Sequence, residues 1–277
     1  MSDQRDEIEK EIAEFKDEHF AKIDKHSIDI KNVCMQIFQL VNYRGAEDFF
    51  DITVSPGIQK CKNLLDMPDK IKEIKSIRKT TEDLFKQHCL YAGISDKANE
   101  CFSPLFNEFE GIISHLGRTG QEISQVAKRI FKEINACPHG EMENRSLNAK
   151  RFERNVIELI QWTFIDEMER IELSSIEDGS LKPDAEFKVV EGFDTKKYCG
   201  FKFSSLIVEC KNYKKPSYKD IMQLFTYTLS WTDSEISENP LCLLISRENP
   251  KDDSVAWKIR KSIFNKPMGS ETRLILF

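Results

Sequence analysis

Apolar residues recur at steps of three and four through the first 135 residues, the period of an amphipathic α-helix. The clearest stretches are Ile30, Val33, Ile37 and Leu40; Ile71, Ile74 and Ile77; Leu105, Phe109 and Ile112; and Ile123, Val126, Ile130 and Ile134. Proline, glycine or aspartate should break the helices at 48–57, at 66–69 and at Gly117–Gly120. This part of the chain is therefore predicted to be an antiparallel bundle of four or five helices.

The pattern changes after the segment 136–145, where Pro138 and Gly140 interrupt the helical period. We place the domain boundary there, between a helical domain at 1–140 and a second domain at 146–277. Strands are predicted at 185–190, 204–211, 241–245 and 273–277, because these runs are short, apolar and rich in β-branched residues. Helices are predicted at 146–169, 217–231 and 254–264, so the second domain mixes helix and strand.

Composition narrows the class of protein. The chain is 40% apolar and 32% charged, and no apolar run reaches eighteen residues, so we expect a soluble protein without a membrane span. Eight cysteines without a Cys-x-x-Cys pair indicate reduced thiols and a cytoplasmic location. A net charge of −6 argues against non-specific coating of nucleic acid, yet a local basic patch would still permit a nuclease.

Two short motifs contain candidate catalytic and metal-binding residues. They are Pro183-Asp184 and, later in the sequence, Glu209-Cys210-Lys211. Side chains alternate along a strand, so Glu209 and Lys211 should project from the same face. Two carboxylates offer the hard oxygen ligands that Mg²⁺ prefers, and a lysine beside them can act on water or on developing negative charge. The alternatives are a turn or cap role for Asp184 and a surface ion pair between Glu209 and Lys211.

The order of these motifs resembles the PD-(D/E)xK nuclease superfamily, and within it the Mrr-type branch, over about residues 147–277. The matching pieces are the helix Arg151–Ile160, Pro183-Asp184, the segment Val208–Pro216 and the helix Ile221–Leu224. The resemblance implies a restriction-endonuclease-like three-layer α/β core with a central mixed sheet. It also implies hydrolysis of DNA phosphodiesters with Mg²⁺, for which Mn²⁺ should substitute.

The same resemblance implies roles for individual residues. Asp184, Glu209 and a carboxylate from the helix would bind the metal, and Lys211 would act on the attacking water or the transition-state charge. Glu153 is favoured over Glu158 as the helix carboxylate, and Glu186 is a further candidate for a second metal. Gln223 would help to order the site. Nucleic acid would contact the following residues: Lys214, Lys215, Lys219 and Tyr227.

Basic residues concentrate in this part of the sequence, and we expect Lys202 to belong to the same patch as Lys211 and Lys219. The helical domain is predicted to form a homodimer or to dock a partner protein. Two alternatives to a DNA endonuclease remain open: a nuclease of the same fold that cleaves RNA, and a catalytically silent module that binds nucleic acid or protein.

Overall fold

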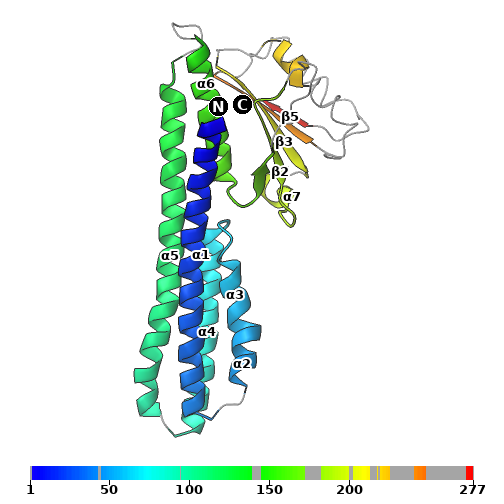
Figure 1. The fold of residues 1–277 in the computed structure, drawn as a ribbon. Coiled ribbons are helices and arrows are strands. Elements are labelled where there is room, and N and C mark those ends of the chain that lie inside the picture. Colours follow the sequence, from blue (N-terminus) through cyan, green and yellow to red (C-terminus); the bar gives the residue numbers. More distant parts are fainter. Residues whose placement is uncertain are drawn as a thin grey trace. The chain divides into compact units, whose positions relative to one another are not determined.

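The computed structural model describes residues 2–42, 45–93, 95–138, 145–171, 182–199, 202–212, 217, 219–224, 240–247 and 273–276. The chain divides into two compact units, Met1–Gln125 and Val126–Phe277. This division falls within a long helix, ahead of the segment 136–145 that we predicted as the boundary. The chain is mostly helical with one mixed sheet, so its class is α+β (Figure 1).

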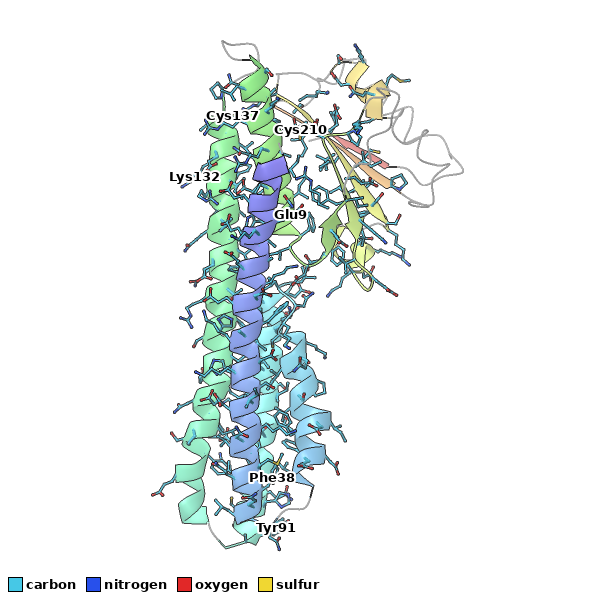
Figure 2. The ribbon with its side chains drawn as sticks, in the orientation of Figure 1. Glu9, Phe38, Tyr91, Lys132, Cys137 and Cys210 are labelled. Carbon is cyan, nitrogen blue, oxygen red and sulfur yellow. The ribbon has the colours of Figure 1, made fainter. Side chains whose placement is uncertain are left out.

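The first unit is built from helices. They are α1 (Ser2–Leu40), α2 (Ala46–Phe49), the π-helical segment η1 (Phe50–Val54), α3 (Ser55–Lys60), α4 (Met67–Tyr91) and the greater part of α5 (Ser95–Ala136). Aromatic rings join them: Phe85 lies 4.6 Å from Phe38 and 5.9 Å from Phe102 between ring centroids. Figure 2 shows Phe38 near the same end of α1 and α4 as Tyr91. The predicted amphipathic stripes supply buried residues to this unit, whereas Leu40 is 60% exposed; the buried ones are Ile30, Ile37, Ile74, Leu105, Phe109 and Ile112.

Two predicted breaks in the first unit are wrong. Residues 48–57 are helical, because Pro56 lies in the first turn of α3, where no backbone N–H is required. Gly57 serves close packing, since a Cβ there would lie 2.0 Å from Ile77 Cδ1 on α4. Gly117–Gly120 is also helical, within α5. The apolar stripe continues across it from the buried Leu116 through the buried Thr119.

The second unit carries the sheet. Its elements are the end of α5, then α6 (Arg145–Thr163), β1 (Met168–Arg170), β2 (Ala185–Val189), α7 (Thr195–Cys199), β3 (Ser205–Lys211), β4 (Pro240–Ser246) and β5 (Arg273–Leu276). The strand order is β1-β2-β3-β4-β5. The pairs β1–β2 and β2–β3 are antiparallel, whereas β3–β4 and β4–β5 are parallel. The four predicted strands are confirmed.

The prediction of helix through 169 is wrong, because the helix ends at Thr163 and β1 follows. The backbone of this segment bonds to β2 instead: Val190 N donates to Glu167 O at 2.9 Å, and Ile171 N donates to Glu186 O at 2.9 Å. The predicted helix 217–231 is described only at 219–224, where it is helical. The predicted helix 254–264 lies outside the described residues.

One face of the sheet packs against α6. The buried residues on the sheet side include Ala185, Phe187, Leu206 and Val208, and those on the helix side are Phe152, Val156, Ile157 and Ile160. Ile207, between Leu206 and Val208 on β3, projects from the opposite face. No helix within the described residues is long and apolar enough to cross a membrane.

Candidate functional site

Asp184 immediately precedes β2 and is held against the end of β3. Its backbone N donates to Val208 O at 3.0 Å, and its Oδ2 accepts a hydrogen bond from Cys210 N at 2.6 Å. These two hydrogen bonds hold Asp184 against the backbone of Val208 and Cys210, the two residues that flank Glu209 in β3. The two sequence motifs, separated along the chain, are therefore brought together by one antiparallel pairing.

Glu209 and Lys211 lie two residues apart on β3 and form an ion pair through Glu209 Oε1 and Lys211 Nζ. Glu209 is only 2% exposed, so the pair is not the surface interaction that the alternative interpretation expected. A carboxylate this deeply buried requires a charged or hydrogen-bonding partner. Lys211 also has Asp220 Oδ1 at 4.0 Å, which adds a second carboxylate to its surroundings.

Helix α6 contributes Glu153 to the same cluster. Burial, followed by the charge of Glu153, raises the pKa of Asp184 to about 6, although the Cys210 amide and Lys211 act in the opposite direction. Burial and the charge of Glu209 raise the pKa of Glu153 in turn. The charge of Glu153 therefore acts on Asp184, and the charge of Glu209 acts on Glu153, which links the three carboxylates. We call Glu153, Asp184, Glu209 and Lys211 the acidic cluster.

Glu158 and Glu186 are the two remaining acidic candidates. Glu158 is 7% exposed and its Oε1 is 3.7 Å from Nη2 of Arg129 on α5, so it serves a different contact. Glu186 is 1% exposed, and burial raises its pKa to about 7. No neighbouring carboxylate contributes to that shift, in contrast to the shifts of Asp184 and Glu153.

Lys211 is a cation at neutral pH. Burial by itself would lower the pKa of its ammonium group, but the hydrogen bond and charge of Glu209, with Asp184 and Asp220, outweigh burial and raise it. An ammonium group donates hydrogen bonds and cannot accept a proton. The structure therefore equips Lys211 to stabilise negative charge, whereas the sequence left open whether it would deprotonate water.

Sequence inspection missed Asp220, which supports the acidic cluster from the following helix. Asp220 Oδ2 accepts from Ser217 N at 2.6 Å and from Ser217 Oγ at 2.7 Å, while Asp220 N donates to Ser217 Oγ at 3.4 Å. This is a reciprocal capping arrangement, and the Ser-x-x-Asp spacing was the available signal. Gln223 lies half-buried and Lys219 exposed on the same helix. Lys214, Lys215 and Tyr227 lie outside the described residues.

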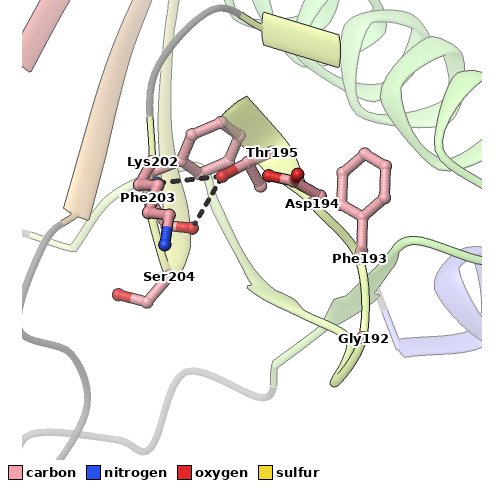
Figure 3. Close-up of a pocket in the computed structure, with 7 residues that line it drawn as sticks. All are labelled: Gly192, Phe193, Asp194, Thr195, Lys202, Phe203 and Ser204. Carbon is pink, nitrogen blue, oxygen red and sulfur yellow. Dashed lines mark hydrogen bonds between the residues drawn. The ribbon is translucent and has the colours of Figure 1, made fainter. Parts of the chain in front are cut away.

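Lys202 does not belong to this site, and its prediction as part of the basic patch is wrong. It precedes β3, whereas Lys211 ends that strand. Lys202 instead lines a cavity of about 490 Å³ at the connection between β2 and β3 (Figure 3). The other lining residues are Gly192, Phe193, Asp194, Thr195, Phe203 and Ser204. None of them belongs to the acidic cluster, which lies at the other end of the β2–β3 pair.

Glu153, Asp184 and Glu209 carry carboxylate oxygens, the type of ligand that hard divalent cations prefer. Across the described part of the chain, no group of three or more His, Cys, Asp or Glu side chains is already arranged to hold a metal ion.

No protein-family model matches the chain. Comparison with curated proteins finds no match, and comparison with solved structures finds none either.

Proposed function

We propose that the chain is a metal-dependent nuclease that hydrolyses DNA phosphodiester bonds, with its site on a restriction-endonuclease-like core in the second unit. The observation that supports this proposal is the acidic cluster. Carboxylates that are distant in sequence act on one another in series, since Glu209 raises the pKa of Glu153 and Glu153 raises that of Asp184, beside the half-buried Lys211. Perturbed groups of this kind concentrate at functional sites, because ordinary structural ion pairs gain nothing from assembling like charges.

Under this proposal Asp184, Glu209 and Glu153 would hold Mg²⁺, or Mn²⁺ in its place. The metal would supply a polarised phosphoryl oxygen and a water of lowered pKa. Lys211 would donate hydrogen bonds to the charge that develops on the phosphoryl group, which its raised pKa favours. Glu209 would be shared between the cation and Lys211, so the existing ion pair keeps the lysine beside the reacting group.

The proton of the attacking water would go to a carboxylate. Lys211 is already protonated, so it cannot accept the proton before the reaction. Glu153 is half-buried and has a raised pKa, which improves a carboxylate as a general base. Asp184 would be the more direct ligand, since the Cys210 amide fixes its Oδ2 at 2.6 Å.

The test is cleavage of supercoiled plasmid and linear DNA with Mg²⁺ or Mn²⁺, alongside EDTA. Lys211→Ala should lower the rate by orders of magnitude, because it removes charge stabilisation in a buried site. Lys188→Ala is the matched control, since Lys188 is an exposed lysine on the adjacent strand β2. Nicked and linear plasmid products separate endonuclease from exonuclease action. Equal cleavage rates for wild type and Lys211→Ala would refute the proposed role of Lys211 and the nuclease site with it.

The same assay separates the alternatives. Metal-dependent cleavage of RNA alone would make the chain a ribonuclease with the same acidic cluster. Binding of either nucleic acid without turnover, in any metal, would indicate a silent interaction module. In that case the cluster would be structural, and the repulsion between Glu153 and Asp184 would serve no reaction.

A further inference from the structure

Arg247 directly follows β4 and donates a hydrogen bond from each of its three guanidinium nitrogens. Its Nε donates to Asn212 Oδ1 at 2.8 Å, its Nη1 to Ile134 O at 2.7 Å and its Nη2 to Cys137 O at 2.5 Å. The guanidinium carbon also lies 4.6 Å from the ring centroid of Phe152. Three hydrogen bonds and one cation–π contact fix a side chain that ordinarily has much rotational freedom.

Asn212 directly follows β3 and is 3% exposed. Its Nδ2 donates to Pro138 O and to Asn148 O, each at 3.0 Å, while its Oδ1 accepts from Arg247. Asn148 O also accepts a hydrogen bond from Cys137 Sγ at 3.4 Å. Both amide hydrogens and the amide oxygen of Asn212 are thus engaged, so the side chain has one orientation.

Together Arg247 and Asn212, which we call the clamp, join three pieces of the second unit. They satisfy carbonyl oxygens at the C-terminal end of α5, where a helix leaves its last carbonyls without partners. They tie this end to the first turns of α6 through Asn148 and Phe152. Figure 2 shows Cys137 at the end of α5 and Cys210 near the end of β3, the regions that the clamp connects.

Two residues that Arg247 contacts are adjacent in sequence to members of the acidic cluster. Phe152, beneath the guanidinium group, is followed by Glu153. Asn212, whose Oδ1 accepts the hydrogen bond from Arg247 Nε, is preceded by Lys211. Arg247 therefore touches the residue next to each of two members of the acidic cluster, one on α6 and one on β3. Arg247 lies outside the pattern on which the nuclease resemblance depends, whereas Asn212 lies within its segment Val208–Pro216.

We propose that Arg247 and Asn212 are positioning residues, which set Glu153 and Lys211 relative to each other for the reaction. This inference rests on the proposed function. Misplacing a catalytic group by about 1 Å can cost about 100-fold in rate. Supporting residues around a site typically account for about 10- to 100-fold. Loss of the clamp should therefore lower kcat while leaving the affinity for substrate intact.

The test uses the full chain and the plasmid assay. Arg247→Lys keeps the charge but cannot make the three-armed contact, and Asn212→Ala removes the amide. Each should lower kcat about 10- to 100-fold and leave KM for DNA within about twofold, because neither residue contacts substrate. Arg129→Lys is the matched control, an arginine on α5 that pairs with Glu133 and Glu158 outside the clamp; it should cleave at the wild-type rate.

A double-mutant cycle separates positioning from general support of the fold. If the clamp acts partly through Lys211, Arg247→Lys should cost much less in a Lys211→Ala background than in wild type. If the rate losses of the two single variants multiply in the double variant, the inference is overturned, because a purely structural loss does not depend on Lys211. Circular dichroism first establishes that each variant is folded. If Arg247→Lys does not fold, Phe152→Leu, which removes the ring beneath the guanidinium group, replaces it in the cycle.

The outcomes distinguish the two proposals. A wild-type chain that cleaves no nucleic acid with Mg²⁺ or Mn²⁺ overturns the proposed function and this inference with it. A wild-type chain that cleaves, together with an Arg247→Lys variant of unchanged kcat, overturns the inference alone. A fall in kcat that depends on Lys211 supports both.

Discussion

Replacing Asp184 by asparagine should stabilise the second unit at alkaline pH while abolishing the proposed activity. Burial and the charge of Glu153 raise the pKa of Asp184 from the ordinary 3.8 to about 6. The favourable contribution of the protonated carboxyl is complete below pH 3.8 and is lost as pH rises through about 6. At pH 8 the folded protein therefore carries an ionised carboxylate that it accommodates poorly.

The size of the effect follows from the pKa. A rise of about two units corresponds to about 3 kcal/mol between the two forms, at about 1.4 kcal/mol per unit. Asparagine removes this cost and keeps an oxygen to accept from Cys210 N. A hydrogen bond to a neutral acceptor is weaker by about 1 kcal/mol than one to a carboxylate. We expect a net gain of about 1–2 kcal/mol at pH 8 and no gain near pH 4.

Urea unfolding followed by tryptophan fluorescence measures this gain. The three tryptophans, Trp162, Trp231 and Trp257, all fall within the second unit in sequence, so the signal reports on that unit. Glu191→Gln, which neutralises an exposed carboxylate in the same unit, is the control and should change little. Mg²⁺ should stabilise the wild type by mass action and the Asp184→Asn variant much less.

Two results would refute this reasoning. One is an Asp184→Asn variant no more stable than wild type at pH 8, which would mean that repulsion in the acidic cluster costs the fold nothing. The other is an equal gain at pH 8 and pH 4, because a benefit independent of ionisation has another source.

Three further predictions concern single groups. Burial raises the pKa of Glu186 to about 7, so the second unit should lose up to about 3 kcal/mol of stability as the pH rises from 4.5 through about 7. Glu186→Gln should abolish this loss, and an unchanged urea unfolding profile would contradict the prediction. Burial and the charge of His19 lower the pKa of His115 to about 4, so the first unit should lose stability as the pH falls from 6.5 through about 4. Hydrogen exchange in α5 should show this loss, and His115→Gln should make the stability less dependent on pH. Glu153→Gln should slow plasmid cleavage at least tenfold and Glu158→Gln should not, whereas the reverse would exchange their roles.

The sequence by itself located the strands that carry Asp184, Glu209 and Lys211. Short apolar runs rich in β-branched residues are local signals, and the alternation of side chains along a strand places Glu209 and Lys211 on one face. It also identified the helical stripes of the first unit. It failed at Gly57 and at Gly117–Gly120, because whether a glycine interrupts a helix depends on what packs against it.

Tertiary structure decided what no local pattern could. Glu153 and Glu158 are five residues apart, about 140° around a helix of 3.6 residues per turn. The resemblance favoured Glu153, and the packing of α6 gives each its surroundings: the charge of Glu209 acts on Glu153, whereas Glu158 lies near Arg129. The protonated state of Lys211 depends on carboxylates from β2, β3 and the following helix. Arg247 carries no motif, yet it meets the end of α5, Phe152 and Asn212. Contacts between residues more than one hundred positions apart, such as Arg247 with Ile134, arise only from the fold.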